Sequence, residues 1–132
     1  AGTPAADQCV SEAGLVVTAT SSHAPILNAN NLRDNAIILA VGAHTVDTRE
    51  LSEDVLASAQ VVVEDLGAAR REAGDVAVGV EKHALEWDDV AVMADVVRGD
   101  VVLDPQRRVV FKTVGMPWED LAVARALVGR LS

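Results

Sequence analysis

The sequence has few aromatic residues and a shortage of positive charge. Among its 132 residues the only aromatic side chains are Phe111, Trp87 and Trp118, and tyrosine is absent. Eleven Lys and Arg stand against 20 Asp and Glu, which gives a formal net charge of −9. Such a surface repels phosphate backbones and offers bases little to stack on, so we expect no nucleic-acid partner. The acidic balance by itself indicates solubility.

Cysteine and long apolar runs are also scarce. Cys9 is the single cysteine, which excludes an internal disulfide and a thiolate metal cluster. No apolar stretch approaches the roughly 18 residues of a membrane span, and no signal-peptide pattern is visible at the N-terminus. His23 and His83 have no partner at metal-ligand spacing, so we expect both at the surface and no metal site. The sequence thus predicts a cytoplasmic protein with no membrane partner.

Valine is abundant, with 23 residues, as is typical of strands buried on both faces of a parallel sheet. Short apolar runs alternate with helical segments, and crossover connections of this kind are nearly always right-handed. The pattern therefore predicts an α/β fold that forms part of a doubly wound parallel sheet with flanking helices. Strands are expected at residues 15–19, 36–41, 60–64 and 107–114, helices at 4–13, about 52–59, 66–73, 87–97 and 117–131, and an extended segment at 75–80.

Cap and turn residues set the limits of these elements. Asp65 is placed to cap the helix at 66–73, and Gly74 is placed to end it. We expect the short basic run 106–108 to lie at a solvated edge. Three acidic pairs begin or flank helices, where the helix dipole explains them without catalysis: Glu53 and Asp54, Asp88 and Asp89, Glu119 and Asp120.

Neither G-x-G-x-x-G nor G-x-x-x-x-G-K occurs in the sequence. A chain of buried strands and helices usually opens with a strand and a glycine-rich turn, whereas here a helix precedes the first strand. We therefore interpret the sequence as one structural unit, residues 1–132, that corresponds to the C-terminal part of something longer.

Three segments follow strands and so are expected at the carboxyl edge of the sheet, where open α/β sheets bind ligands. They are Thr20-Ser21-Ser22, residues 41–45 and residues 113–115. Small or hydroxylated side chains and free backbone groups in these segments suit close approach to a ribose or a flat ring. The alternative is that the hydroxyls only cap strand ends and begin turns.

His44 is the most informative single residue. It lies two residues past the end of a strand, in a loop, where an imidazole can transfer a proton near pH 7. A histidine that only bonds to backbone or water explains the position equally well.

Five blocks, in this order, resemble the ornithine cyclodeaminase/mu-crystallin family, from about residue 5 to the end of the chain. They are residues 15–22 with Pro25-Ile26-Leu27, residues 40–45, Asp47 to Leu51, Glu72 to Asp75, and Val110 to Gly115 with Glu119 and Asp120.

The resemblance implies a Rossmann-like domain that binds NAD or NADP beside a substrate and dimerisation domain. It implies hydride transfer on an amino or imino acid, in a homodimer, with the last helix (about 117–131) packing toward the other domain. Within the site, Thr20, Ser21 and Ser22 would line the cofactor, Val41, Gly42 and Ala43 would pass close to the nicotinamide, Thr113 would lie beside nicotinamide and substrate, and Val114 would contact the substrate.

The sequence departs from the family pattern at three positions. His44 stands where cyclodeaminases carry a proton-exchanging aspartate, Thr48 stands where they carry a cofactor-contacting lysine, and Thr113 replaces a serine. Two functions therefore remain open. One is an NAD(P)-dependent enzyme in which His44 transfers a proton, and the other is a non-catalytic remnant of the fold that acts as a binding or interaction module.

Overall fold

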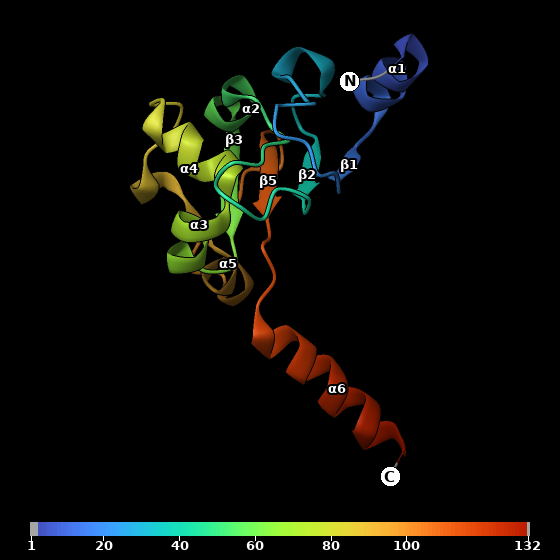
Figure 1. The fold of residues 1–132 in the computed structure, drawn as a ribbon, viewed down its shortest axis with the longest axis vertical. Coiled ribbons are helices and arrows are strands. Elements are labelled where there is room, and N and C mark those ends of the chain that lie inside the picture. Colours follow the sequence, from blue (N-terminus) through green and yellow to red (C-terminus); the bar gives the residue numbers. More distant parts are fainter. Residues whose placement is uncertain (1–2, 132) are drawn as a thin grey trace.

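The computed structural model describes residues 3–131, and within them it contains a five-stranded, entirely parallel sheet. The strand order is β1-β2-β5-β3-β4 (Figure 1). The prediction of a parallel α/β sheet is confirmed, and all four expected strands are present. The strands in sheet order are β1 (Leu15–Thr18), β2 (Ile37–Ala40), β5 (Arg108–Lys112), β3 (Ala59–Val63) and β4 (Ala91–Val92).

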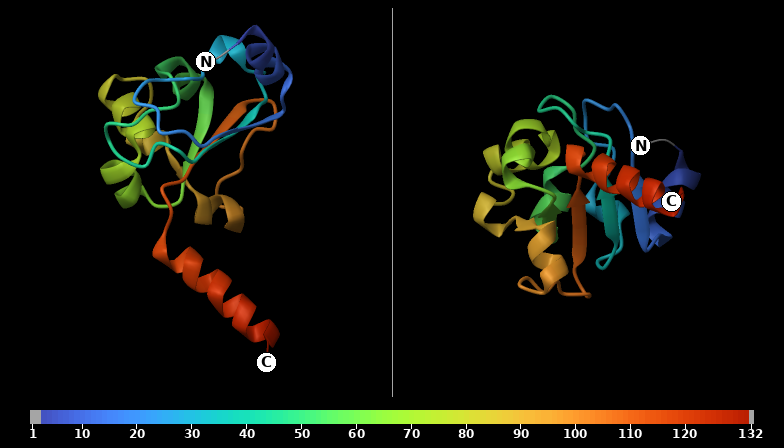
Figure 2. Two further views of the ribbon diagram at one scale, coloured as in Figure 1. Left: turned by 45° about the vertical axis from the view of Figure 1, so that its right-hand side comes forward. Right: turned by 90° about the horizontal axis from the view of Figure 1, so that it is seen from below.

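Helices connect the strands and lie on both sides of the sheet. In Figure 2, α3 and α4 lie on one side and α5 lies on the other. Asp65 caps α3 as expected, because its carboxylate accepts a hydrogen bond from the Ala68 backbone N–H. The helices are α1 (Pro4–Glu12), α2 (Glu53–Ser58), α3 (Leu66–Glu72), α4 (Gly74–Glu81), α5 (Met93–Arg98) and α6 (Pro117–Leu131), with short 3₁₀ turns η1 (Ala29–Asn31) and η2 (Trp87–Asp89).

The two faces of the sheet differ in how well they are covered. Along β5, residues 108, 110 and 112 are buried on the face that packs against the main core, whereas Val109 and Phe111 are half-buried on the opposite face. In β1, Val16 points into the core, and its neighbours Leu15 and Val17 point to the opposite face of the sheet. Both are more than half exposed. The main core contains Val16, Ile38, Ala40, Val61, Val63 and Val110 of the strands with Val55, Leu56, Ala69, Ala73 and Val76 of the helical layer.

Residues 75–80 are helical, so the prediction of an extended segment there is wrong. Alternate valines favour a strand locally, but Val76 is fully buried against the core, and this packing outweighs the local propensity. Gly74 was expected to end a helix and instead begins α4. A Cβ atom at Gly74 would lie 2.3 Å from the Thr48 carbonyl oxygen, so only glycine lets α4 approach that loop so closely.

The expected helix at 87–97 is also partly wrong. Only residues 93–98 form an α-helix, preceded by η2 and by the two-residue strand β4. Ala91 and Val92 pair with Val62 and Val63, and these ladder bonds interrupt the helical periodicity. Gly99 ends α5 in a left-handed conformation.

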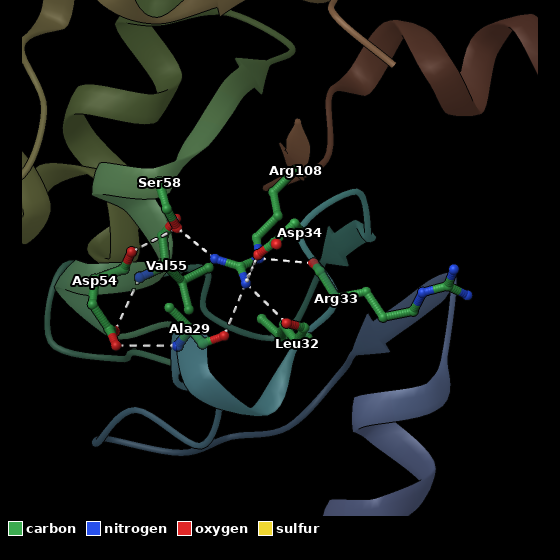
Figure 3. A network of polar contacts seen from close by, with 8 residues as sticks. All are labelled: Ala29, Leu32, Arg33, Asp34, Asp54, Val55, Ser58 and Arg108. Atoms are coloured by element: carbon green, nitrogen blue, oxygen red, sulfur yellow. Dashed lines mark hydrogen bonds and ion pairs between the residues drawn. The ribbon is translucent and has the colours of Figure 1, made fainter. Parts of the chain in front are cut away.

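Arg108 is buried at the amino end of β5, so its expected place at a solvated edge is wrong. Its guanidinium donates to the carbonyl oxygens of Ala29, Leu32 and Arg33 and to Ser58 Oγ, at 2.8–3.0 Å (Figure 3). It also contacts the Asp34 carboxylate at 3.1 Å. A guanidinium with this many acceptors is satisfied without water, and it links β5 to the segment around η1 and to α2.

The last helix, α6, extends away from the sheet in both figures of the fold. It begins at Pro117 with Glu119 and Asp120 in its first turn, as expected. The side chains of residues 120–130 are exposed, and they include Leu121, Val123, Leu127 and Val128. None of the described helices combines the length and hydrophobicity that crossing a bilayer requires.

Candidate functional site

All five strands are parallel, so their carboxyl ends meet at one edge of the sheet. The loops after β1, β2 and β5 lie at this edge and contain every residue that the sequence singled out for binding or catalysis. β2 pairs with both β1 and β5, which places the three loops next to one another. The expectation that these segments converge is therefore correct.

Glu50 lies beneath two of these loops and is fully buried. Its Oε1 accepts a hydrogen bond from the Thr20 N–H at 2.6 Å, and its Oε2 accepts from Thr18 Oγ1 at 2.8 Å. Oε2 also accepts from the N–H groups of Gly42 at 2.9 Å and Ala43 at 3.3 Å. Burial alone would raise the pKa of Glu50, but these donors outweigh it and the pKa lies below its ordinary value.

Asp75, in the first turn of α4, fixes the backbone that carries Glu50. Its Oδ1 accepts from the N–H groups of Glu50 at 2.7 Å and Leu51 at 2.9 Å. Burial raises the pKa of the Asp75 carboxyl above its ordinary value, although these two N–H groups and the charge of Lys112 act against the rise. Through Asp75, the α4 helix, which the sequence did not predict, thus holds the backbone of Glu50 in place.

Lys112, the last residue of β5, is buried with 1% of its surface exposed. Its ammonium group donates to the carbonyl oxygens of Ala40 at 2.9 Å and Thr113 at 2.8 Å. Burial lowers the pKa of Lys112, while the charges of Asp75, Glu50 and Glu64 act to raise it. The lysine therefore joins the end of β2 to the loop after β5 and balances the buried carboxylates.

Glu64 follows β3 directly and fixes the third loop. Its carboxylate accepts from Thr113 Oγ1 at 2.5 Å and from the N–H groups of Val114 at 3.1 Å and Gly115 at 3.2 Å. Thr113 and Val114 are half-buried as a result. Two buried glutamates, Glu50 and Glu64, thus set the conformation of all three loops.

The prediction of free backbone groups in these loops is wrong for most of their N–H groups. The amides of residues 20, 42, 43, 114 and 115 all donate to Glu50 or Glu64. A ligand at this edge therefore meets mainly hydroxyl groups, carbonyl oxygens and side chains. Thr20 and Ser21 are exposed, Ser22 is half-buried, and Val41 is 44% exposed.

Gly42 and Ala43 serve the packing of the loops. A Cβ atom at Gly42 would lie 2.2 Å from the Thr20 carbonyl oxygen, so a larger residue would separate the first loop from the second. Ala43 is fully buried, and its side chain points into the protein. Of the triplet 41–43, Val41 presents the most side-chain surface to solvent.

His44 is exposed, and its Nδ1 lies 2.8 Å from the Gly42 carbonyl oxygen. A carbonyl oxygen only accepts hydrogen bonds, so Nδ1 must carry a proton. In the neutral ring the basic lone pair is then on Nε2. His23 and His83 are exposed, as expected, and the described residues contain no group of three His, Cys, Asp or Glu suited to a metal ion.

Sequence reasoning missed the four buried charged residues that support this edge: Glu50, Glu64, Asp75 and Lys112. For two of them the sequence holds a hint of burial. Lys112 follows the apolar residues 109–111 within a strand, and Glu64 follows three consecutive valines that are buried. A charge at such a position must be paired or hydrogen-bonded, and that requirement marks it for attention.

Two of the clefts beside the sheet bear on the choice of site. A largely apolar cleft of about 200 Å³ lies between α1 and β1 and reaches Thr20, at the candidate site. A larger cleft of about 400 Å³ lies at the amino ends of β3 and β4, lined by Gln60, Asp89 and Arg107 among others. The smaller cleft is the one relevant to the site, since the larger lies at the opposite edge of the sheet.

The model of the ornithine cyclodeaminase/mu-crystallin family matches residues 3–132. The chain belongs to this family. The chain is 37% identical over 111 residues to Delta(1)-pyrroline-2-carboxylate reductase 2 of Burkholderia ambifaria. The aligned region covers 84% of the chain and 33% of that protein. It is 32% identical over 118 residues to mouse ketimine reductase mu-crystallin, with 89% of the chain and 36% of that protein covered.

Solved structures of other proteins share the fold. The iminosuccinate reductase of Paracoccus denitrificans in complex with NAD+ matches with a TM-score of 0.83 and 28% identity, over 93% of this chain and 38% of that one. The probable ornithine cyclodeaminase of Bordetella pertussis matches with a TM-score of 0.81 and 34% identity, over 89% and 39%. The chain spans about a third of the length of the curated relatives it matches.

Proposed function

We propose that the carboxyl edge of this sheet is part of the NAD(P) site of an enzyme that acts on an amino or imino acid by hydride transfer. The observation that supports this most is the convergence of the three loops on two buried glutamates in a family whose members include imino acid reductases. Because the chain spans about a third of these relatives, the activity, substrate and partners of the whole protein belong to the proposal.

The side chains exposed at this edge suit the ribose and nicotinamide part of a dinucleotide. Thr20, Ser21 and Ser22 offer hydroxyl groups, and Val41 offers an apolar surface on which a flat ring can lie. Thr113 lies across from them, with its hydroxyl oriented by Glu64. Neither Gly42 nor Ala43 has a spare N–H group, so their contribution is to bring the loops close together. A bound reduced nicotinamide supplies a hydride to the carbon of a C=N bond.

Reduction of an imine also requires a proton at its nitrogen, and His44 is placed to provide it. As an imidazolium His44 donates from Nε2, and in the reverse direction its neutral ring accepts the proton there. Val114, half-buried in the loop after β5, is the proposed substrate contact.

The imidazole of His44 also bears on the class of substrate. A carboxylate at this position would pair with the ammonium group of a diamino acid, whereas a neutral imidazole would not. We therefore favour an imino acid, of the kind that the names of the relatives in Burkholderia ambifaria and mouse describe, over ornithine.

The test is a titration of the purified protein with NADH and NADPH, followed by assays with cyclic imino acids. His44→Asn is compared with His83→Asn, because both histidines are exposed and asparagine tolerates the positive φ of His83. We expect His44→Asn to lower kcat about 100-fold or more with little change in cofactor affinity, which is the scale of general acid catalysis. The His83 variant should match the wild type.

Equal loss of cofactor affinity and turnover in His44→Asn would remove the proton-transfer role. Absence of NADH and NADPH binding to the wild-type protein would contradict the proposed function itself.

The assembly and location follow from the same proposal. We expect a homodimer in the cytoplasm, where NAD(P)H is available, with α6 packing toward a substrate and dimerisation domain. The apolar residues exposed on α6, among them Leu121 and Leu127, support this role for the helix.

A second candidate function is a non-catalytic binding or interaction module. The exposed apolar side chains of Leu15, Val17 and Ile37 on one face of the sheet favour it, because a soluble monomer rarely leaves neighbouring apolar residues uncovered. The titration with NADH and NADPH distinguishes the two functions, since an interaction module needs no cofactor affinity.

A further inference from the structure

The peptide group between Gly42 and Ala43 has a hydrogen-bond partner on each side. Its N–H, on Ala43, donates to Glu50 Oε2 at 3.3 Å, and its carbonyl oxygen, on Gly42, accepts from His44 Nδ1 at 2.8 Å. Both groups belong to one planar amide. A single peptide unit therefore separates a buried carboxylate from the exposed imidazole.

Such an arrangement lets the charge of the carboxylate polarise the peptide group and so affect the imidazole. A carboxylate that accepts from the N–H of an amide draws electron density toward the carbonyl oxygen, which becomes a better acceptor, by about 10–30% per bond in condensed-phase estimates. The stronger acceptor favours the proton on His44 Nδ1. The lone pair on Nε2 is then the one presented to a reacting group.

Glu50 is fixed too firmly to reach the imidazole itself. Asp75 binds the backbone N–H of Glu50 at 2.7 Å, and the carboxylate is already shared among donors from the loops after β1 and β2. The hydrogen-bonded path from Glu50 to His44 therefore passes through the peptide group.

We infer that Glu50 is a positioning residue for His44, which acts through the Gly42–Ala43 peptide to set the imidazole's orientation and its tautomer. The inference rests on the proposed proton-transfer role of His44 and deepens it. The arrangement replaces a direct carboxylate–histidine pair with a carboxylate–peptide–histidine chain.

Glutamine in place of Glu50 would keep the shape and remove the effect. The Thr20 N–H donates to Oε1, and two backbone N–H groups and a threonine hydroxyl donate to Oε2, so the NH2 group of an amide would face a donor at either position. Either placement removes the negative charge that polarises the Gly42–Ala43 peptide. Glu50→Gln is therefore the informative variant, and Glu81→Gln, at an exposed position on α4, is the matched control.

The experiment is ¹⁵N NMR of the imidazole and backbone in the cofactor-free chain, at about pH 8.5, where an ordinary histidine is neutral. In the wild type we expect the proton of His44 on Nδ1 and a downfield Ala43 amide proton. In Glu50→Gln we expect the population of the Nε2–H tautomer to rise several-fold and the Ala43 amide proton to move upfield. Glu81→Gln should leave both signals unchanged.

Turnover supplies the second measurement. We expect Glu50→Gln to lower kcat about 10-fold and Glu81→Gln to leave it unchanged. If Glu50→Gln is folded and the His44 tautomer does not move, the inference is overturned, whatever happens to activity. The inference is also overturned if the neutral ring of His44 carries its proton on Nε2 in the wild-type protein. This measurement needs no variant, so it tests the inference even if the Glu50→Gln protein fails to fold.

The two proposals fail separately. Absence of NAD(P)H binding to the wild type contradicts the proposed function, while the tautomer and the Ala43 amide signal still decide whether the carboxylate acts on the histidine.

Discussion

Arg107 and Arg108 are neighbours in sequence, but only Arg108 lies inside the protein. Arg107 is exposed before β5, whereas the guanidinium of Arg108 meets four neutral oxygen acceptors and one carboxylate (Figure 3). Removing the guanidinium takes the donor from three carbonyl groups, one of which belongs to the buried Leu32. The pair therefore provides its own control for the energetic cost of the network.

We expect Arg108→Met to lower the free energy of unfolding by about 3 kcal/mol, because several charge-assisted hydrogen bonds are lost together. Arg107→Met should change it by less than about 0.5 kcal/mol. Urea denaturation of both variants measures the difference, and equal stabilities would contradict the role assigned to Arg108. The network lies at the amino edge of the sheet, so NADH affinity of the folded Arg108→Met protein should match the wild type.

At the level of single residues, the sequence predicted those whose chemistry follows from position after a strand. Thr20, Val41, His44 and Thr113 all lie at the expected edge. Glu50 was beyond prediction, because its role depends on donors that arrive from residues 18–20 and 42–43. A single sequence shows that a charged residue is present but does not show what surrounds it.

Among the elements, α2 and α4 are joined by a cluster of charges at their ends. Lys82, which follows α4, contacts Glu53 of α2 at 2.5 Å, and Arg49 contacts the same carboxylate at 3.1 Å. The hydrogen bond from Lys82 is the main cause that lowers the pKa of Glu53 to about 2. Ionised Glu53 therefore favours the folded state.

The sign of the pH effect follows from this lowered pKa. Above its ordinary value of 4.5 Glu53 contributes its full stabilisation, and the contribution is lost as the pH falls from about 5 toward 2. Since the pair is partly exposed, we expect on the order of 1 kcal/mol. Chemical denaturation at neutral and acidic pH should show Glu53→Gln losing stability at neutral pH and converging with the wild type in acid. Glu86→Gln, on an exposed side chain, should parallel the wild type throughout.

The elements that the sequence predicted best are those with one dominant local signal. The four longer strands are apolar runs. A capping aspartate precedes α3, and a proline lies in the first turn of α6. The failures, α4 and the segment 87–98, have local patterns that tertiary contacts overrule. α4 is helical because Gly74 and Val76 pack closely against the loop at 45–48 and the core, and β4 exists because β3 offers it a partner.

For the molecule as a whole, the contrast between the sheet and α6 is the largest difference in packing. The core strands have helices on both faces of the sheet, whereas α6 extends away with the side chains of 120–130 exposed. A 15-residue helix by itself is marginal in water. The two parts of the chain should therefore differ in local stability.

Hydrogen–deuterium exchange on the 132-residue chain tests this. We expect amides of 121–130 to exchange about as fast as in a frayed peptide helix, and amides of β2 and β5 to exchange through the slowest openings. Binding of a partner domain or subunit to α6 would slow the exchange of the helix selectively. Equal protection of α6 and the sheet in dilute protein would contradict the independence of α6.

The position of β5 also bears on how the chain is made. Within residues 3–131, β5 lies between β2 and β3 and joins them, yet it is the last of the five strands in sequence. During synthesis, β1 with β2 and β3 with β4 emerge as two separate parallel pairs, each with an unpaired inner edge. The sheet closes only when residues 108–112 have left the ribosome, which makes the nascent chain dependent on protection from aggregation until then.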